Sequence, residues 1–231
     1  MTHKISIIIP TLNEADHIAN LLKYLIHSSS KENISDIIVV DGGSDDDTQH
    51  VVSGFKNIIL LSSEKGRAKQ MNVGAKSATG NILYFLHADS FPPKNFDASI
   101  INEVQKGNQA GCFRMQFDSN HWWLCLAGWL TKFNWRTCRG GDQSQYITKT
   151  VFDNIGGFDE RYIIYEDNIL INELYSRKQF VVINKKIKTS ARLYRKHGIW
   201  KLQYHFWAIY VKKWLGASAD DIHSYYKKHI S

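Results

Sequence analysis

The sequence predicts an α/β fold in which a central, mostly parallel sheet is flanked by helices. Short β-branched runs alternate with segments that carry apolar residues on one face at helical spacing. Strands that alternate with helices form parallel pairs joined by right-handed crossovers. Polar or acidic residues stand where several apolar runs end, and open sheets of this kind bind ligands at the carboxyl ends of their strands.

Size and composition fit one domain. The chain has 231 residues, of which 43% are hydrophobic and 22% charged, so it can bury a sizeable core. It has only three prolines and 15 glycines, which leaves no segment typical of a long linker. We therefore expect a single domain over residues 1–231, with a regular half at residues 1–90 and a more mixed half at residues 91–231.

Four short apolar runs in the first half predict buried strands, at residues 5–9, 37–40, 58–61 and 82–86. The helix after the first strand has one apolar face, formed by Ile18, Leu21, Leu22, Leu25 and Ile26. Thr11 and Glu14 have capping-box spacing at its start, and Ser44 can cap a second helix over about residues 46–55. A third helix is expected over residues 67–78.

The second half mixes the two patterns. Residues 111–117 and 144–148 have the character of strands. Helices are expected over residues 121–135, 166–176 and 199–215. This mixture indicates that the sheet continues beyond the regular half with a different connectivity.

The excess of basic residues indicates an anionic partner. Lys and Arg number 29 against 22 acidic residues, which gives a formal net charge of +7. A nucleotide, an anionic lipid surface and a nucleic acid all suit such a charge. No nucleic-acid-binding motif is present and the basic residues are scattered until the last quarter, so we do not expect nucleic acid to be the partner.

The three cysteines, Cys112, Cys125 and Cys138, have spacings unlike any zinc or redox motif. We expect small buried residues with free thiols in a reducing compartment. No signal-peptide h-region follows Met1, and no apolar stretch is long enough for a spanning helix. These features favour a cytoplasmic location.

Asp41 directly follows the second predicted strand and precedes Gly42 and Gly43. A carboxylate at that position can accept hydrogen bonds from a base or a ribose, and the glycines permit a tight turn and a close ligand approach. The alternative is an ordinary acidic turn.

Asp89 follows the fourth predicted strand, two residues after His87. A carboxylate at a strand end can bind a hard divalent cation that bridges nucleotide phosphates; the alternative is a helix cap or turn residue.

Arg67, at the start of the third helix, can bind a phosphate together with the free N–H groups of that helix end. Alternatively, Arg67 belongs to a solvated basic face.

Glu166 and Asp167 form an acidic pair in a region that is otherwise rich in Ile and Leu. One carboxylate can act as a general base on a hydroxyl group. The other can orient that group or stabilise the helix start. A solvated helix N-terminus is the alternative.

In this order, several segments together resemble the inverting family 2 glycosyltransferases of the GT-A fold, and the similarity spans nearly the whole chain. The segments are residues 10–14 (Pro-Thr-Leu-Asn-Glu), 41–48 (Asp-Gly-Gly-Ser-Asp-Asp-Asp-Thr), 66–75 and the Glu-Asp pair at 166–167. Residues 189–192 and 215–218 also resemble a bacterial subgroup labelled as associated with arsenosugar biosynthesis.

The resemblance implies transfer of a sugar from a nucleoside diphosphate sugar to an acceptor hydroxyl, with inversion and with Mg²⁺ or Mn²⁺ as cofactor. Residues 1–90 would be the nucleotide-binding half and residues 91–231 the acceptor half. Asp167 would be the catalytic base, with Glu166 beside it, and Asp89 and His197 would hold the metal. The residues expected to bind the nucleotide sugar are Pro10, Thr11, Asn13, Glu14, Asp41, Gly43, Ser44, Arg67, Gln70, Asn72, His87 and Ala88.

The sequence departs from the family pattern at His87, which stands at the first position of the Asp-x-Asp metal motif. In many enzymes of this fold that position meets the ribose or diphosphate, and the last Asp holds the metal. The resemblance therefore still implies a metal on Asp89, with a weaker metal dependence left open.

Residues 140–143 (Gly-Gly-Asp-Gln) are expected to form a loop over the acceptor side. Gly141 permits a close approach, Asp142 can hydrogen-bond a sugar hydroxyl, and Gln143 lies beside them. The alternative is a simple turn before a strand.

The second half is also rich in aromatic residues. Four tryptophans are close in sequence, and a stripe recurs every three or four residues along the last predicted helix, with Lys201, His205, Lys212 and Lys213 beside it. The aromatic positions are Trp122, Trp123, Trp129, Trp135, Trp200, Tyr204, Trp207 and Trp214, together with Val211. Such a stripe can lie in a membrane interface, which would suit a lipid-linked acceptor at the inner face of a membrane. The simpler interpretation is that the helix packs onto its own domain or a second subunit.

Two other functions stay open. A nucleotidyltransferase can share a nucleotide-binding sheet, but that class is expected to carry a glycine-rich basic loop after the first strand, and residues 10–14 contain no glycine. A non-catalytic sugar-nucleotide-binding protein would keep the crevice, and the intact Glu166–Asp167 pair argues against it. A dehydrogenase is not expected, because no Gly-x-Gly-x-x-Gly follows the first strand.

Overall fold

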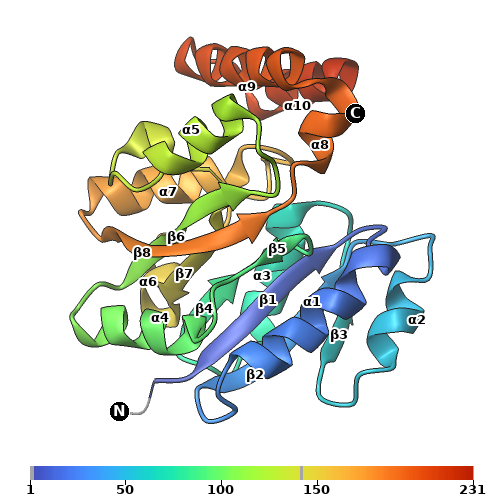
Figure 1. The fold of residues 1–231 in the computed structure, drawn as a ribbon, viewed down its shortest axis with the longest axis vertical. Helices are drawn as coiled ribbons and strands as arrows, with labels where there is room; N and C mark the ends of the chain where they lie inside the picture. Colours follow the sequence, from blue (N-terminus) through green and yellow to red (C-terminus); the bar gives the residue numbers. More distant parts are fainter. Residues whose placement is uncertain (1–2, 141–142, 231) are drawn as a thin grey trace.

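The structure is a computed structural model that describes residues 3–140 and 143–230. Its strands form one eight-stranded sheet in the order β3-β2-β1-β4-β7-β6-β8-β5 (Figure 1). The strands are β1 (Ile5–Thr11), β2 (Ile34–Asp41), β3 (Ile59–Ser62), β4 (Ile82–Phe85), β5 (Ser90–Phe91), β6 (Ala110–Phe117), β7 (Gln145–Thr148) and β8 (Phe180–Thr189). The helices are α1 (Ala15–Ser28), α2 (Thr48–Ser53), α3 (Arg67–Ser77), α4 (Phe96–Gln105), α5 (Trp122–Leu130), α6 (Lys149–Ile155), α7 (Glu166–Ser176), α8 (Arg192–His197), α9 (Ile199–Trp214) and α10 (Ala219–His229), with a 3₁₀ turn at Arg136–Cys138.

Most neighbouring strands are parallel, which confirms the prediction. Parallel pairings join β3 to β2, β2 to β1, β1 to β4, and β6 to β8. β7 runs antiparallel between β4 and β6, and the short β5 pairs antiparallel with β8 at the edge. The strands of the first half therefore all end at the same edge of the sheet.

Helices cover both faces of this sheet (Figure 1). Alternation along β1 sends Ile7 and Ile9 to one face and Ile8 to the other. The first face packs against α1, α2 and α4, and the second against α3, α6 and α7. The predicted core is therefore divided into two layers by the sheet.

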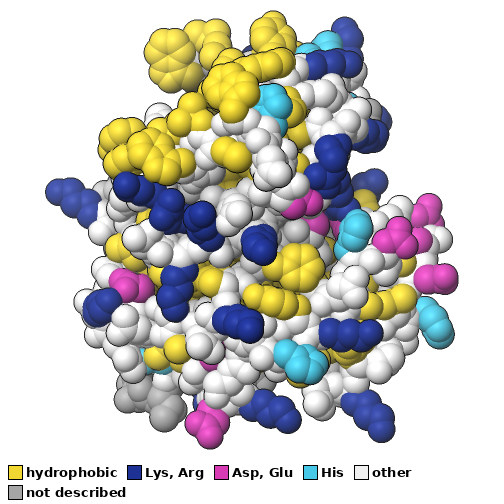
Figure 2. Space-filling view, in the orientation of Figure 1, with side chains coloured by type: hydrophobic (Ala, Val, Ile, Leu, Met, Phe, Trp, Pro, Cys, Tyr) yellow, Lys and Arg dark blue, Asp and Glu magenta, His cyan; other side chains and the backbone are white. Residues whose placement is uncertain are grey.

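The C-terminal helices form a further layer together with α5. They share a separate apolar cluster around Leu124, Leu202, Ile209 and Ile222, and they lie at the top of Figure 1. Hydrophobic side chains gather on the outside of this region in Figure 2. In the part of the chain that the structure describes, no helix is long and apolar enough to cross a membrane.

The predicted capping box at α1 is wrong. Thr11 is the last residue of β1 and does not cap the helix. The carboxylate of Glu14 accepts from Arg192 and not from the start of its own helix. The first N–H groups of α1 are bonded from the neighbouring loop: that of Glu14 donates to Oγ1 of Thr48 (2.8 Å), and that of Ala15 to Oδ2 of Asp46 (3.1 Å). A cap supplied from 31 residues away cannot be recognised by local spacing.

The predicted cap of α2 is also wrong. Ser44 donates its hydroxyl to Asp41, and α2 begins four residues later, at Thr48.

The prediction of buried thiols is confirmed for Cys112 and wrong for Cys125, which is exposed.

The sequence patterns also miss several elements, of which β8 is the longest strand of the described sheet. Its second half alternates buried and exposed positions, with Ile187 buried and Lys186 and Lys188 exposed. Because lysine is depleted in strands, this segment does not present the continuous apolar run that marks the first four strands. The short helices α4, α6, α8 and α10 are further additions to the prediction.

Gly74 lets α3 lie directly on the sheet. A Cβ added at this residue would lie 2.5 Å from Cγ2 of Ile8 and 3.2 Å from Cγ2 of Val40. We expect Gly74→Ala to lower the free energy of unfolding by about 1–3 kcal/mol, the usual cost of overpacking a core, in spite of the better helix propensity of alanine. Urea denaturation followed by circular dichroism measures this change.

The control for this substitution is Gly54→Ala, where the new Cβ would make only an ordinary contact, 3.4 Å from the carbonyl oxygen of Val51. Equal losses of stability in the two variants would contradict the close packing of α3.

Candidate active site

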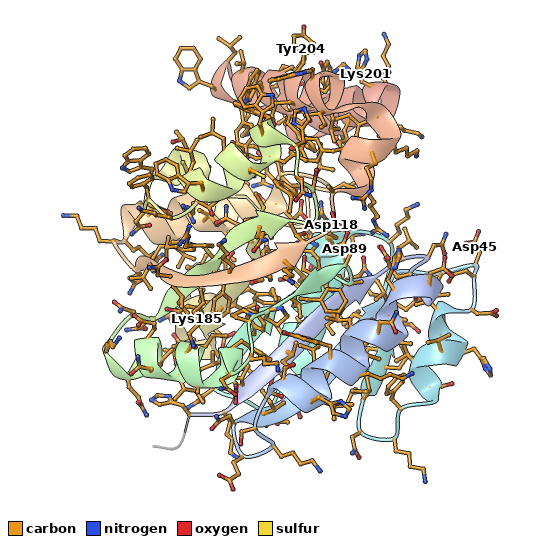
Figure 3. All side chains as sticks on the ribbon, in the orientation of Figure 1. Asp45, Asp89, Asp118, Lys185, Lys201 and Tyr204 are labelled. Atoms are coloured by element: carbon orange, nitrogen blue, oxygen red, sulfur yellow. The ribbon has the colours of Figure 1, made fainter. Side chains whose placement is uncertain are left out.

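The carboxyl ends of β1, β2 and β4 form one edge of the sheet. Thr11 at the end of β1 is paired with Asp41 at the end of β2. The N–H of Leu86, which follows β4, donates to the carbonyl oxygen of Ile8 in β1 (3.0 Å). Parallel pairing therefore brings the polar segments after these strands together, and Asp89 is labelled near this edge in Figure 3.

Asp41 is fully buried and organises the loop after β2. Its carboxylate accepts hydrogen bonds from the N–H groups of Gly43 (3.0 Å) and Ser44 (2.9 Å), from the Ser44 hydroxyl, and from Nε2 of Gln49 (2.7 Å). Burial by itself raises the pKa of Asp41, but these hydrogen bonds together outweigh burial and leave the pKa below its usual value. The carboxylate therefore shapes the loop from inside rather than facing solvent.

The loops after β1 and β2 are bonded to each other through Asn13. Its N–H donates to Oγ of Ser44 (2.9 Å), and its Oδ1 accepts from the N–H of Asp45 (3.0 Å). Asn13 has a φ of 56°, in the left-handed region that asparagine tolerates. Gly43 has a φ of 88°, and a Cβ there would meet nothing within 4 Å, so a ligand can approach this backbone closely.

Arg192, the first residue of α8, connects the end of β1 to Asp89. Its guanidinium donates to both carboxylate oxygens of Glu14, with 2.9 Å between Nη1 and Oε2. Its Nε lies 3.3 Å from Oδ2 of Asp89. The hydrogen bond to Glu14 raises the pKa of Arg192, while burial opposes that rise. A permanent cation therefore lies between the carboxylates predicted to bind the nucleoside and the metal.

Arg67, the first residue of α3, connects the end of β4 to α7. Its Nε lies 3.0 Å from Oε1 of Glu166, and its Nη1 lies 3.4 Å from Nδ1 of His87. The side chain of Glu166 is only 1% exposed, whereas that of Arg67 is 40% exposed. Because a buried carboxylate needs a paired cation, Glu166 fixes the guanidinium in place while part of it stays accessible to a ligand.

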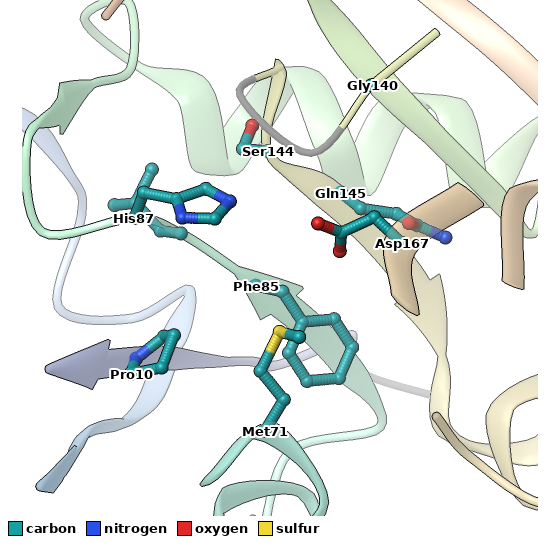
Figure 4. A pocket seen from close by; sticks show the side chains of 9 residues that line it. Pro10, Met71, Phe85, His87, Gly140, Ser144, Gln145 and Asp167 are labelled. Carbon is teal, nitrogen blue, oxygen red and sulfur yellow. The ribbon is translucent and has the colours of Figure 1, made fainter. Parts of the chain in front are cut away.

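Asp167, at the start of α7, lines a pocket at the edge of the sheet. Figure 4 shows its carboxylate opposite His87, with Phe85 and Met71 on another wall. The pocket is lined by Pro10, Met71, Phe85, Leu86, His87, Gly140, Ser144, Gln145 and Asp167. Because Asp167 lies in the first turn of α7, the helix N-terminus stabilises its negative charge. Asp41 and Asp89 do not line this pocket; they border the loops beside it.

The backbone is strained just before the acidic pair. Tyr165 has a φ of 74°, which is uncommon for an aromatic residue. Its ring packs against Tyr210 of α9, with 5.3 Å between the centroids, and the hydroxyl of Tyr210 donates to Oδ1 of Asn168 (3.3 Å). Strain of this kind persists only where the surroundings impose it, and it clusters at functional sites.

Gln70 and Asn72 support the crevice from below. Nε2 of Gln70 donates to the carbonyl oxygens of Thr11 and Val40 (2.8 Å each), at the ends of β1 and β2. Asn72 bonds the backbone N–H and carbonyl of Phe158 (2.9 Å each). Both side-chain amides form hydrogen bonds within the protein. Their predicted contribution to donor binding would therefore be indirect, because they position the segments that border the donor.

The predicted acceptor residues are only partly described. Gly141 and Asp142 lie outside the described residues. Gln143 is buried: its Oε1 accepts from Nη1 of Arg139, and its Nε2 donates to the carbonyl oxygen of Cys138 (2.6 Å). Its side chain therefore belongs to an internal network, and its part in acceptor binding stays a prediction.

Asp89 suits a metal that is completed by the substrate. Among the residues that the structure describes, no group of three or more His, Cys, Asp or Glu side chains is arranged to hold a metal ion. Ions such as Mg²⁺ need only one or two protein carboxylates when phosphates and water supply the other ligands. Asp89, with a partly exposed carboxylate at a strand end, fits that role when Arg192 releases its Oδ2.

His197, at the end of α8, lies toward the C-terminal helices. α9 begins two residues later, at Ile199. The role of His197 as a metal ligand stays a prediction.

Sequence reasoning overlooked the roles of Gln49, Ser144, Gln145 and Arg192. Ser144 and Gln145 line the pocket, although the sequence marks them only as the start of a strand. Arg192 meets Glu14 across 178 positions of sequence. Its only sequence signal is its place in residues 189–192, which resemble a bacterial subgroup.

The chain belongs to Glycosyl transferase family 2, whose profile matches residues 6–159. The match covers the loops after β1, β2 and β4 and the helix that carries Arg67. The acidic pair Glu166–Asp167 and Arg192 lie beyond it.

Curated relatives are similar over part of their length. Glycosyltransferase AglE of Haloferax volcanii is 30% identical over 94 residues, which are 38% of this chain and 31% of AglE. The dolichyl N-acetyl-alpha-D-glucosaminyl phosphate 3-beta-D-2,3-diacetamido-2,3-dideoxy-beta-D-glucuronosyltransferase of Methanococcus voltae is 30% identical over 109 residues, 44% of this chain and 34% of that protein. Probable glycosyltransferase YdaM of Bacillus subtilis is 24% identical over 199 residues, 75% of this chain and 47% of YdaM. This chain therefore spans less than half the length of these relatives.

Solved structures confirm the GT-A fold. TarS of S. aureus in complex with UDP-GlcNAc superimposes with a TM-score of 0.66 at 20% identity, over 81% of this chain and 58% of that one. Mannosyltransferase PcManGT of Pyrobaculum calidifontis, in complex with GDP-Man and Mn²⁺, gives a TM-score of 0.64 at 18% identity, over 90% of this chain and 61% of that one.

The loop around Asp41 offers a pH-dependent test. Asp41→Asn leaves its buried donors with a weaker acceptor, so we expect it to lower the free energy of unfolding at pH 7 by about 1–3 kcal/mol. The pKa of folded Asp41 is lowered, so its stabilisation is present above about pH 4, the usual pKa of an aspartate. It is lost as the pH falls through the lower pKa of the folded state.

Chemical denaturation of wild type and Asp41→Asn at several pH values from about 3 to about 7 measures the difference between their free energies of unfolding. This difference should shrink at the acid end. Asp45→Asn, an exposed change in the same loop, is the control and should be nearly neutral. If the difference in free energy of unfolding between wild type and Asp41→Asn stayed constant with pH, Asp41 would not be the charged group that stabilises the loop.

Proposed function

We propose that this protein transfers a sugar from a nucleoside diphosphate sugar to an acceptor hydroxyl, with inversion at the anomeric carbon. The observation that carries the proposal is the pocket in which Asp167 faces His87 at the edge of the sheet. The attack of a hydroxyl on a phosphate-activated sugar needs a base and positive charge near the phosphates, and here Asp167 faces His87, which has Arg67 beside it. Membership of Glycosyl transferase family 2 supports it.

The donor's nucleoside would lie over the loops after β1 and β2. Asn13, Glu14, Gly43 and Ser44 border this surface, and Asp41 shapes it from below. Pro10, Thr11 and Ala88 would complete the strand ends beside it. TarS and PcManGT were solved with UDP-GlcNAc and GDP-Man respectively, which supports a nucleotide-sugar donor while leaving its base and sugar open.

The diphosphate would be bound from both sides of His87. Arg67 has an accessible guanidinium that is held by buried Glu166, so Glu166 is a positioning residue for that contact. Asp89 would hold Mg²⁺ or Mn²⁺, an ion that offsets the charge developing on the departing nucleoside diphosphate. PcManGT was solved with Mn²⁺, which supports the choice of ions.

Asp167 would act as the base. It accepts the proton of the acceptor hydroxyl, whose oxygen forms a bond to the anomeric carbon on the face opposite the diphosphate. The bond from the anomeric carbon to the diphosphate oxygen breaks, and the electron pair leaves with the nucleoside diphosphate. The α7 N-terminus and the strained Tyr165 would keep the carboxylate at a defined position.

For the acceptor, we propose a lipid-linked molecule at the cytoplasmic face of a membrane. The name of the Methanococcus voltae relative includes a dolichyl N-acetyl-alpha-D-glucosaminyl phosphate, which is a lipid-linked sugar. In this chain, α9 contacts the site through Tyr210 and Asn168 and carries exposed tryptophans. The arsenosugar-associated subgroup suggested by residues 189–192 and 215–218 stays a prediction about the acceptor.

Two rival functions are separated by one assay. Release of a nucleoside diphosphate from a panel of UDP- and GDP-sugars supports the transferase, whereas pyrophosphate from a nucleoside triphosphate and a sugar phosphate would show a nucleotidyltransferase. Binding of donors without any release would show a non-catalytic protein. Thermal-shift screening of nucleoside diphosphates with and without Mn²⁺ first selects the base, since ligands of the native state raise its melting temperature.

Asp167→Asn tests the proposed base. We expect nucleoside diphosphate release to fall on the order of a hundredfold or more, with the melting-temperature shift produced by the nucleoside diphosphate unchanged. Glu173→Gln, an isosteric change further along α7 where Glu173 pairs with Arg177 at the surface, is the matched control. Near-normal turnover by a folded Asp167→Asn protein would remove Asp167 from the mechanism.

A further inference from the structure

We propose that the outer surface of α5 and α9 docks on an anionic lipid bilayer. We call it the aromatic face and define it by the exposed side chains of Trp122, Trp200, Tyr204, Trp207, Val211 and Trp214. Tyr204, which Figure 3 labels, lies at the outer end of the molecule. This docking goes beyond the proposed function and does not depend on it.

Rings of α5 and α9 pack against each other within the aromatic face. The ring of Trp200 lies 5.7 Å from that of Trp122 and 5.5 Å from that of Trp123, and Trp123 lies 5.8 Å from Trp207. Trp123 is held from inside, since its Nε1 donates to Oε1 of Gln203 (3.0 Å). Rings from α5 and α9 therefore form one surface rather than scattered exposed residues.

Packing within the domain does not account for this surface. α9 buries Leu202 and Ile209 against its neighbours, so the simpler interpretation of the stripe holds for that side of the helix. On the other side, Trp214 is 85% exposed and Tyr204 is 63% exposed. Large aromatic side chains that gather on one exposed side of a helix indicate an interaction site.

The charge around the aromatic face selects an anionic occupant. α9 carries Lys201, Lys212 and Lys213 and no acidic residue. α5 has no acidic residue either, and Lys132 lies over the ring of Trp129 beyond its end (5.3 Å). A second copy of the chain would bring the same positive charge against this face, whereas anionic lipid would neutralise it.

The residue types also fit a bilayer rather than a protein partner. Trp and Tyr, with apolar rings and a polar tip, are enriched where hydrocarbon meets water, and lysines beside them reach the headgroups. Here Lys201 and Lys212 lie on the helix that carries Trp200, Tyr204 and Trp214. Such a helix lies in the interface plane.

Vesicle co-flotation of the full chain tests the docking. We expect binding to phosphatidylcholine vesicles that contain phosphatidylserine, and little binding to phosphatidylcholine alone or at high salt. Tyr204→Ser with Trp214→Ser should weaken the binding roughly tenfold or more, given the contribution of one or two buried aromatic side chains. Both side chains are largely exposed, so folding should persist, as circular dichroism would verify.

The control is Ile59→Ser, which removes an exposed apolar side chain from β3, far from the aromatic face in the sheet order. No flotation with anionic vesicles at low salt, or equal flotation of Tyr204→Ser/Trp214→Ser and wild type, would overturn the proposal. Light scattering that shows a dimer dissociated by the same double variant would instead assign the face to a second copy.

A different observation carries a second inference, which rests on the proposed function. We infer that Arg192 is a latch that occupies the cation position between Glu14 and Asp89 until the donor arrives. Its Nε is 3.3 Å from Asp89 and its Nη atoms engage Glu14. A divalent ion cannot use Oδ2 of Asp89 while the guanidinium holds it, and the released guanidinium would lie beside the diphosphate.

The latch is held firmly at its base. The N–H of Ala191 donates to Oδ1 of Asp118, which follows β6, and Nη1 of Arg195 lies 3.0 Å from the same carboxylate oxygen. The turn before α8 is therefore anchored, and only the long side chain of Arg192 is free to swing. A residue from the C-terminal quarter of the chain thus pairs with two carboxylates of the site.

Manganese binding to the nucleotide-free protein tests the latch without any reaction. We expect Arg192→Gln to bind Mn²⁺ roughly two- to fivefold more tightly than wild type by electron paramagnetic resonance titration, the range set by a partly exposed ion pair. The same variant should bind the nucleoside diphosphate selected by thermal shift roughly tenfold more weakly, because a charged hydrogen-bond donor is lost.

Arg195→Gln, one turn further along α8 and paired with Asp118, is the matched control and should change neither affinity. Unchanged or weaker Mn²⁺ binding by a folded Arg192→Gln protein would overturn the latch. Absence of nucleoside diphosphate binding by wild type would instead count against the proposed function, so the two failures are distinguishable.

Discussion

The parallel pairing of β1 with β2 and β4 is the constraint on which the candidate site depends. Because these strands share one direction, the segments that follow Thr11, Asp41 and Phe85 emerge at one edge. Gln70 holds two of these ends together by donating to the carbonyl oxygens of Thr11 and Val40. A slip in either pairing would separate the loops that the site combines.

Two arginines connect this edge to the rest of the chain, each through an ion pair with a carboxylate. Arg67 pairs with buried Glu166 of α7, and Arg192 of α8 pairs with Glu14 and Asp89. Each brings a cation from one half of the molecule to a carboxylate of the other, where partial burial strengthens the attraction. The proposed diphosphate site therefore already holds two positive charges before a ligand enters.

The C-terminal helices extend the site toward a surface. α9 contacts Tyr165 and Asn168 around the acidic pair through Tyr210, while its outer side forms the aromatic face. The same helix thus links the candidate base with a basic, aromatic surface. That arrangement would bring a hydroxyl carried on a lipid close to Asp167, because docking and chemistry would share one rigid element.

The sequence by itself determined the first half of the fold and the strand-end residues Asp41 and Asp89. A β-branched apolar run indicates a buried strand, and the polar residues after it indicate where that strand ends, so neighbouring residues are enough for both predictions. It also marked Glu166 and Asp167, through resemblance more than through pattern. Only the tertiary structure decided that Gln143 faces inward, that Trp214 stays outside and that Arg192 reaches Glu14. Each of these depends on contacts between residues far apart in the chain. The strand β8, in which lysines flank Ile187, escaped prediction for the same reason, because its burial is set by neighbouring strands.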